Sequence, residues 1–307
     1  MKNRLLITGG SGFIGLNLKK LLEHSDFNIC SVGRASSEDY RIELNSTLQN
    51  EDSFLSFLNN FKPNIICHLA SGTNITRANE NKEKEFNDTV ASTKSLTRIL
   101  NKLNSKPHKI IYLSSQAVYG IPQFLPVTEE HATKPVTVYG DCKLQAEKIL
   151  FESGINTIIL RVSSVYGPKQ NPNKSGVIAK FIDKLKNNTS PVVFNSFDLY
   201  SDFIYVDDLI SSIISAVKFE SKQKNHICNI GSGKPTTLRE ILDILYKSFK
   251  DAPKPELRLN QLYPDKQIRG LYLDIGKAKE FLNWQPKYTI EKGLRIMLQD
   301  MNLVNKS

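Results

Sequence analysis

A glycine-rich turn that directly follows an apolar segment near the N-terminus is the strongest constraint on the fold. The segment Arg4–Thr8 is rich in Leu and Ile, and Gly9, Gly12 and Gly15 follow it before a stretch of helical periodicity. In this context Gly9 permits a tight turn, Gly12 lets backbone N–H groups approach a pyrophosphate, and Gly15 lets the helix pack on the sheet. The turn therefore predicts a dinucleotide site at the N-terminus of the first helix.

Short apolar runs alternate with longer segments of helical periodicity. The runs are nearly continuous, as expected of strands covered on both faces. Strand–helix–strand repetition implies parallel pairing with right-handed crossovers, so we expect an α/β fold with a doubly wound, Rossmann-type parallel sheet. The expected strands are Arg4–Thr8, Asn28–Val32, Asn64–Leu69, Lys109–Leu113, Thr157–Arg161 and Ile227–Ile230, and the expected helices include Ile14–Leu22, Glu85–Leu103 and Lys143–Glu152.

The pattern changes after Arg161, where glycines and prolines break up the chain. Helices such as Val177–Leu185 and Thr237–Phe249 then mix with proline-rich loops. We expect residues 1–166 to form the dinucleotide-binding domain and residues 167–307 to form mainly a smaller, substrate-binding α/β lobe. A strand near 227–230 is expected to return to the Rossmann sheet.

Composition excludes several classes of protein. The chain has 307 residues and a net charge of +10, but Lys and Arg are scattered, so we expect an anionic small substrate and no nucleic acid. No apolar run approaches the roughly 18 residues that span a membrane, and no secretory signal is apparent. The four cysteines show no metal-ligand spacing, so we expect no bound metal. We also expect a reducing, cytoplasmic location.

The end of the second strand bears on the choice of cofactor. An acidic residue there would hydrogen-bond the ribose 2′-hydroxyl of NAD, but the chain has Gly33 followed by Arg34. A guanidinium can bind a 2′-phosphate with paired hydrogen bonds, and Ser36 and Ser37 could add donors. The sequence favours NADP(H) and leaves NAD(H) open, because Arg34 could instead stack on the adenine.

Three further residues suggest a reacting centre. Ser115 ends the strand near residues 109–113, and Tyr139 and Lys143 are spaced to share one face of a helix. A nearby ammonium favours the phenolate form of tyrosine, and lowering its pKa from about 10 to about 7 needs roughly 4 kcal/mol. Ser115 would hydrogen-bond the reacting oxygen and position it for proton transfer.

With these motifs in order, the chain resembles the extended short-chain dehydrogenase/reductase family, in particular its NAD-dependent epimerase/dehydratase group. The resemblance extends over nearly the whole chain. It covers residues 8–15, 68–71, 114–120, 128–130, 139–143, 160–168, 202–208, 229–233 and 272–274.

The resemblance implies roles for individual residues. Ser115, Tyr139 and Lys143 would be the catalytic set. Tyr139, Lys143 and the following residues would contact the cofactor: Gly9, Gly12, Phe13, Ile14, Gly15, Arg34, Glu43, Leu44, Leu69, Ala70, Ser71 and Val165. The substrate would meet Thr73, Gln116, Ser164 and Ser201. The family also implies a homodimer formed through two helices per subunit, including the Tyr139 helix.

Departures from the family pattern narrow the reaction. Sugar dehydratases of the family usually carry an Asp–Glu pair where this chain has Gln116 and Ala117, so dehydration is not expected. Ser164 stands where the family has Asn, and Ser201 where it often has Arg. An Arg expected just before Pro264 is also missing. Either the substrate class differs, or other cations hold a diphosphate, the candidates being Lys169, Lys174, Lys180 and Arg269.

Three functions agree with this sequence. The first is an NADPH-dependent reductase of a nucleotide-linked 4-keto-6-deoxy sugar, with Tyr139 protonating the forming alkoxide. The second is an NAD-dependent nucleotide-sugar epimerase that retains its cofactor, because both reactions need the same hydride and proton steps. The third is a non-catalytic dinucleotide-binding sensor, against which the intact Ser115, Tyr139 and Lys143 set argues.

Overall fold

A computed structural model describes residues 3–45, 49–72, 75–173, 176–259 and 270–304. It contains two compact units, which we describe separately. Unit 1 comprises Met1–Gly120, Ala132–Arg161 and Ile210–Cys228, and unit 2 comprises Ile121–His131, Val162–Leu209 and Asn229–Ser307. Segments of the two units alternate along the chain. The sequence predicts a single domain boundary after residue 166, and this division into domains stays a prediction.

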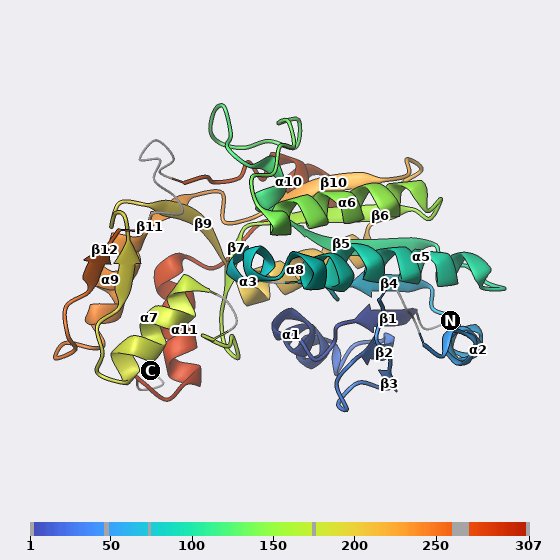
Figure 1. The fold of residues 1–307 in the computed structure, drawn as a ribbon, viewed down its shortest axis with the longest axis horizontal. Coiled ribbons are helices and arrows are strands. Elements are labelled where there is room, and N and C mark those ends of the chain that lie inside the picture. Colours follow the sequence, from blue (N-terminus) through green and yellow to red (C-terminus); the bar gives the residue numbers. More distant parts are fainter. Residues whose placement is uncertain (1–2, 46–48, 73–74, 174–175, 260–269, 305–307) are drawn as a thin grey trace. The chain divides into compact units, whose positions relative to one another are not determined.

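The central sheet has seven strands in the order β10-β6-β5-β4-β1-β2-β3 (Figure 1). The pairs β1–β2, β1–β4, β4–β5 and β2–β3 are parallel, which confirms the predicted Rossmann-type α/β fold. Both faces of its central strands are buried. The bounds are β1 Arg4–Thr8, β2 Asn28–Gly33, β3 Tyr40–Arg41, β4 Ile65–His68, β5 Lys109–Ser115, β6 Thr157–Val162 and β10 His226–Ile230.

Helices connect these strands, and their buried residues complete the core of unit 1. Leu6, Ile66 and Ile110 of three neighbouring strands belong to one buried cluster with Leu96 and Leu150 from the helices. Helices α5 and α6 pack side by side (Figure 1). The helices are α1 Phe13–Leu22, α2 Glu51–Phe61, α3 Ile75–Glu80, α4 Lys82–Phe86, η1 Asn87–Ala91, α5 Ser92–Lys102, η2 Gln116–Tyr119, α6 Val138–Glu152 and α8 Val206–Lys218.

Two of the expected helices differ in detail. The stretch expected as one helix over Glu85–Leu103 contains a π-helical turn at η1, where the N–H of Ser92 bonds the carbonyl of Asn87. This wide turn adds a residue to one turn, so the simple helical period does not describe the segment. Helix α6 begins at Val138, before Lys143, because the Thr137 side chain accepts the N–H of Gly140 at 3.1 Å.

Unit 2 is built from two small sheets and several helices. A three-stranded sheet has the order β11-β9-β7, and β8 pairs with β12 in parallel. The bounds are β7 Ser164–Tyr166, β8 Val192–Phe194, β9 Tyr200–Tyr205, β11 Pro235–Thr237, β12 Glu256–Arg258, α7 Val177–Lys186, α9 Leu238–Tyr246, α10 Gly276–Leu282 and α11 Ile290–Asp300.

A buried carboxylate organises the family-like segments of unit 2. Asp202 is fully buried, and its oxygens accept N–H groups of Ser232, Gly233 and Leu273 at 2.6, 3.1 and 3.2 Å. Three segments far apart in the sequence are therefore joined at one side chain. The segments around residues 202, 232 and 273 have a structural function here that the sequence pattern alone did not reveal.

Candidate active site

The glycine turn joins β1 to α1 and leaves the helix N-terminus open to an anion. Gly9 has a φ of 74°, in the left-handed region that favours glycine, and its N–H bonds the carbonyl of Val32 at 2.9 Å. Gly12 is the N-cap of α1, which has no side-chain cap and no acidic residue in its first turn. Its first N–H groups and positive dipole end suit a phosphate.

The segment after β4 lies directly against this turn. A Cβ on Gly9 would lie 2.9 Å from the N atom of Ala70, so only glycine allows this approach. The N–H of Ala70 also bonds Thr8 Oγ1 at 3.1 Å, and the N–H of Leu69 bonds the carbonyl of Thr8 at 3.1 Å. The structure thus brings the predicted cofactor residues Leu69 and Ala70 beside the glycine turn.

Ser115, Tyr139 and Lys143 come together within unit 1. Ser115 ends β5, and the other two lie one turn apart on α6. The Tyr139 hydroxyl interacts with the Ser115 side chain, and Lys143 Nζ lies 5.8 Å from the centroid of the Tyr139 ring. Burial raises the pKa of Tyr139 to about 12, although the Ser115 hydrogen bond acts in the opposite direction. Further positive charge nearby is needed to lower the pKa of Tyr139 toward neutral pH.

Lys143 is buried and held by two acceptors. Its Nζ donates to Ser71 Oγ at 2.7 Å and to the carbonyl of Leu113 at 2.8 Å. Burial lowers the pKa of Lys143 to about 8, while the carboxylates of Glu85 and Glu147 raise it. The ammonium is therefore fixed in position and close to titrating in the physiological range.

Glu85 is a buried acid near these residues that sequence reasoning missed. Its Oε1 accepts the Thr89 hydroxyl at 2.8 Å, and Thr89 Oγ1 accepts the N–H of Gly72 at 2.9 Å. A side chain at Gly72 would collide with the Glu85 carboxylate. Burial raises the pKa of Glu85, and Lys143 acts in the opposite direction. The carboxylate thus lies under the segment that also supplies Ser71.

A second buried acid supports the strand that ends at Ser115. Glu147 of α6 pairs with the Arg161 guanidinium through contacts of 3.1 and 2.8 Å and also accepts the Ser114 hydroxyl. Both charged side chains are at most 5% exposed. Because the acid lies one turn after Lys143 on α6, this network fixes the helix against β5 and β6.

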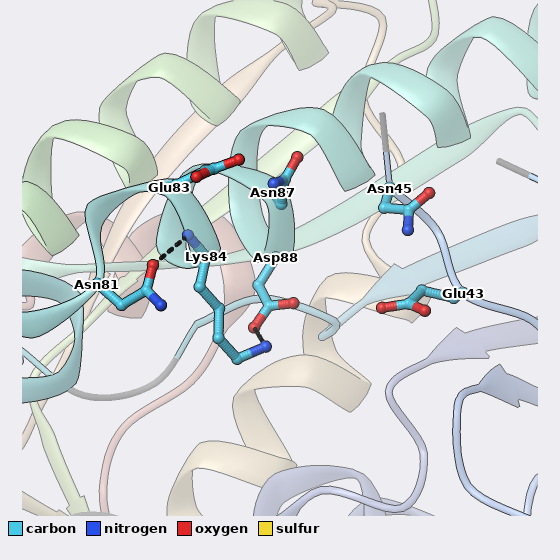
Figure 2. A pocket seen from close by; sticks show the side chains of 7 residues that line it. All are labelled: Glu43, Asn45, Asn81, Glu83, Lys84, Asn87 and Asp88. Carbon is cyan, nitrogen blue, oxygen red and sulfur yellow. Dashed lines mark hydrogen bonds and ion pairs between the residues drawn. The ribbon is translucent and has the colours of Figure 1, made fainter. Parts of the chain in front are cut away.

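The end of β2 carries an arrangement that differs from the expected 2′-phosphate site. Arg34 is half exposed, and its Nη1 lies 3.4 Å from Glu43 and 3.1 Å from Asp88. Its guanidinium is thus already paired with two carboxylates. Glu43 and Asp88 border a surface pocket, shown in Figure 2, which is otherwise lined by Asn45, Asn81, Glu83, Lys84 and Asn87.

Glu38 is another acid that sequence reasoning missed at this end. Its Oε1 accepts the N–H of Ser11 at 2.6 Å, so it joins the loop after β2 to the glycine turn. Its side chain has no exposed surface. No motif pointed to Glu38, because the usual position for an acid is the end of β2 at Gly33.

The other predicted site residues are spread over both units. Gln116 begins η2 in unit 1, directly after Ser115. In unit 2, Ser164 and Ser201 lie on neighbouring strands with their hydroxyl oxygens 3.1 Å apart, and Val165 follows on β7. Lys169 and Lys180 are exposed. Thr73, Lys174 and Arg269 lie outside the described residues.

The described residues offer neither a metal centre nor a membrane-spanning helix. They contain no group of three or more His, Cys, Asp and Glu side chains placed to hold a metal ion. No helix in the same part of the chain is long and apolar enough to cross a membrane. The four cysteines are buried and unpaired with one another.

This fold and site define a dinucleotide-binding oxidoreductase of the Rossmann type, with a Ser–Tyr–Lys set beside the glycine turn. The family model described as the NAD-dependent epimerase/dehydratase family matches residues 5–231. The chain belongs to this family, which confirms the resemblance drawn from the sequence.

Relatives and solved structures agree on this membership. A Methanocaldococcus jannaschii protein provisionally named as a UDP-glucose 4-epimerase is 31% identical over 99% of this chain and 100% of its own length. An Escherichia coli dTDP-4-dehydro-6-deoxyglucose reductase is 26% identical over 98% of both chains. The Thermotoga maritima UDP-glucose 4-epimerase, solved with UDP-glucose, has a TM-score of 0.86 and 25% identity, covering 97% of this chain and 98% of its own.

A further structure resembles the fold with a cofactor present. The Bacillus cereus UDP-glucuronic acid 4-epimerase, solved with UDP-glucuronic acid and NAD, has a TM-score of 0.84. It is 21% identical, and the match covers 97% of this chain and 99% of that one. At this identity the likeness is one of fold.

Proposed function

We propose that the protein is an NAD-dependent 4-epimerase of a nucleotide-linked sugar. The observation that carries this proposal is the joining of Ser115, Tyr139 and Lys143 in one site beside the glycine turn, where the Lys143 ammonium is buried. Such a set supplies a proton acceptor and donor at a carbinol that is oxidised and re-reduced. The 4-epimerase names of the Methanocaldococcus and Thermotoga relatives, together with the near-complete coverage of both chains, support the choice of reaction.

The residues present fit a dinucleotide. The uncapped N-terminus of α1 suits its pyrophosphate, and the loop around Leu69, Ala70 and Ser71 lies beside the same turn. Glu43 borders the pocket of Figure 2, whose amide and carboxylate side chains suit the hydrogen-bonding edge of an adenine. Phe13, Ile14, Leu44 and Val165 are retained as proposed cofactor contacts. When bound, the nicotinamide supplies the hydride acceptor and donor.

The chain's own residues would handle the proton. Tyr139 would take the proton of the sugar hydroxyl as its carbon is oxidised, and return it after the carbon has been re-reduced from the other face. Ser115 would hold the reacting oxygen, because its side chain already interacts with the Tyr139 hydroxyl. Lys143 would favour the phenolate by its charge, since Ser71 and Leu113 keep its ammonium in place.

Reduction of a 4-keto sugar with NADPH is the second candidate. It is favoured by the absence of an acid at Gly33, by Arg34 next to it, and by the E. coli reductase among the relatives. The pairing of Arg34 with Glu43 and Asp88 weakens this argument, because a 2′-phosphate would have to compete with two carboxylates. We therefore place the epimerase first and NAD before NADP.

Substrate contacts and assembly follow as parts of the proposal. Gln116, next to Ser115, and the Ser164–Ser201 pair of unit 2 are the proposed polar contacts for the sugar and its diphosphate. A homodimer is proposed through two helices per subunit, one of which is α6. The exposed Phe86 and Val136 support that interface, because they border one apolar-lined pocket at the N-terminal end of α6.

Retention of the cofactor tests the proposed function. An epimerase regenerates its cofactor in each cycle, whereas a reductase must exchange it. Mass spectrometry of nucleotide released from freshly purified protein should detect NAD, and the dialysed protein should still convert a UDP-hexose without added cofactor. A protein that purifies empty and needs stoichiometric NADPH would support the reductase instead.

A further inference from the structure

Glu38 connects three parts of the chain where the glycine turn meets the end of β2. Its Oε1 accepts the N–H of Ser11 at 2.6 Å. A Cβ on Gly10 would lie 2.7 Å from its Oε2, and a Cβ on Gly33 would lie 3.0 Å from its Oε1. The carboxylate thus occupies the space that side chains at both glycines would fill.

This location is the one where the fold normally places an acid. In dinucleotide-binding folds an Asp or Glu at the end of the second strand hydrogen-bonds the ribose 2′-hydroxyl and repels a 2′-phosphate. Gly33 holds that position here and has no side chain. Glu38, five residues later along the chain, brings a carboxylate to the space next to Gly33 from the loop after β2.

The charge of Glu38 is only partly compensated. Its Oε2 is buried and has no hydrogen-bond partner among the described residues, and the nearest cation is Lys19 Nζ at 3.8 Å. Arg34, the other cation at this end, is paired with Glu43 and Asp88. A 2′-phosphate would therefore meet a buried negative charge and no uncommitted guanidinium.

We propose that Glu38 is the residue that selects NAD(H) over NADP(H), by placing a buried negative charge beside the 2′-position of the adenosine ribose. This inference rests on the proposed function, since it assumes that a dinucleotide binds at the glycine turn. Like charges brought together at a recognition site cost enough to exclude a competing ligand. The selecting residue lies in the loop after β2, whereas the usual sequence rule considers only the last residue of that strand.

Binding measurements on protein stripped of nucleotide test this role. Dissociation constants for NADH and NADPH would be measured from nicotinamide fluorescence for wild type, Glu38→Gln and Asp39→Asn. Asp39→Asn is the matched control, since it removes the same charge one residue along, where the exposed carboxylate bonds Ser31 instead of the glycine turn. We expect wild type to prefer NADH by at least about 10-fold.

The two variants should show whether the preference for NADH depends on where the negative charge lies or only on its presence near the site. Glu38→Gln should reduce the preference to within about 3-fold, mainly by tightening NADPH, and Asp39→Asn should leave it within about 2-fold of wild type. A wild type that prefers NADPH, or an unchanged preference in Glu38→Gln, would overturn the role of Glu38. A wild type that binds neither dinucleotide would instead overturn the proposed function, and the role of Glu38 with it.

A second measurement does not depend on any variant. Adenosine 2′,5′-bisphosphate and AMP differ only in the 2′-phosphate, so their competition against NADH in wild type isolates the effect of that group. We expect the bisphosphate to compete at least about 10-fold more weakly. Equal or tighter binding of the bisphosphate would contradict the proposal even if Glu38→Gln failed to fold.

Discussion

Lys143 donates a hydrogen bond to Ser71, with Nζ and Oγ 2.7 Å apart, and so joins helix α6 to the segment after β4. Lys143 is a proposed catalytic residue and Ser71 a proposed cofactor contact. The bond therefore links the proposed reacting centre to the proposed cofactor segment. Because the ammonium is buried and its pKa is lowered to about 8, its charge is sensitive to pH.

The first prediction concerns this charge. Cofactor affinity should weaken as the pH rises through about 8, because Lys143 then loses its proton and its charge. The Glu85 carboxylate raises the pKa of Lys143, so Glu85→Gln should lower that pKa and shift the weakening to lower pH. Dissociation constants for NADH across pH 6–10 would measure both midpoints. Glu80→Gln, an exposed charge at the end of the neighbouring helix α3, is the control and should not shift the midpoint.

A flat wild-type profile to pH 10 would show that Lys143 does not titrate in this range. Equal midpoints for wild type and Glu85→Gln would show that the carboxylate has no influence on Lys143. Both outcomes are distinct from loss of folding, which circular dichroism at each pH would detect.

The second prediction separates two tyrosines near the same lysine. Tyr139→Phe should lower turnover by about 10²–10⁴-fold and leave cofactor affinity within a few-fold of wild type, because it removes the proton donor alone. Tyr112→Phe is the matched control. The Tyr112 hydroxyl is buried without a hydrogen-bond partner among the described residues, and Lys143 Nζ lies 5.0 Å from its ring centroid.

Removing that hydroxyl loses no hydrogen bond, so Tyr112→Phe should retain activity. Initial rates at saturating substrate would compare the two variants. Tyr139→Phe retaining more than about a tenth of the wild-type rate would refute its role as the general acid and base.

The third prediction distinguishes two glycines of the turn. Gly12→Val should fold and lose cofactor binding, because a Cβ there meets only the carbonyl oxygen of Gly9, at 3.2 Å, yet its branches would obstruct the phosphate. Gly15→Ala should distort the turn itself, since its Cβ would lie 2.5 Å from the same oxygen and 2.6 Å from Gly10 Cα. Thermal melts with and without NADH would separate the two effects. A Gly12→Val protein that NADH still stabilises as strongly as wild type would argue against the phosphate site.

The fourth prediction concerns the buried pair under the site. Arg161→Met should reduce the free energy of unfolding by about 3–5 kcal/mol, because it leaves the Glu147 carboxylate buried without its partner. The double variant Glu147→Leu/Arg161→Met should recover much of this loss, since no charge is then stranded. Urea denaturation would measure both variants. An unchanged stability for Arg161→Met would mean that the pair contributes nothing to the fold.

Periodicity and glycine spacing were sufficient to predict six of the seven strands of the central sheet, because they reflect local backbone requirements. The seventh, β3, has only two residues and shows no such pattern. Each expected strand appears within a few residues of its expected position, and the glycine turn lies between β1 and α1. Ser115, Tyr139 and Lys143 could be selected because hydroxyl, phenol and amine recur in an interpretable order and spacing. They meet in one site because Ser115 ends β5 and helix α6, which carries Tyr139 and Lys143, packs against that strand.

Glu38 and Glu85 could not be found in this way. Glu38 reaches the end of β2 from a loop, and no spacing rule describes how that loop folds back onto Ser11. Glu85 lies in a stretch rich in charged residues, which is typical of a helix face exposed to solvent. In the structure it is buried, and a π-turn follows it directly. The sequence favours a phosphate as the partner of Arg34, because its pairing with Glu43 and Asp88 arises only in the folded chain. Asp88 belongs to that same π-turn.

The central claim is that this site epimerises a nucleotide-linked sugar with a retained NAD. Proton NMR of the purified protein with UDP-glucose, without added cofactor, tests it most directly through the anomeric signals of the two C4 epimers. We expect that UDP-galactose appears, that the same equilibrium is reached from either direction, and that Tyr139→Phe abolishes the interconversion. No interconversion of UDP-hexoses, together with stoichiometric oxidation of NADPH by a nucleotide-linked 4-keto-6-deoxy sugar, would contradict it.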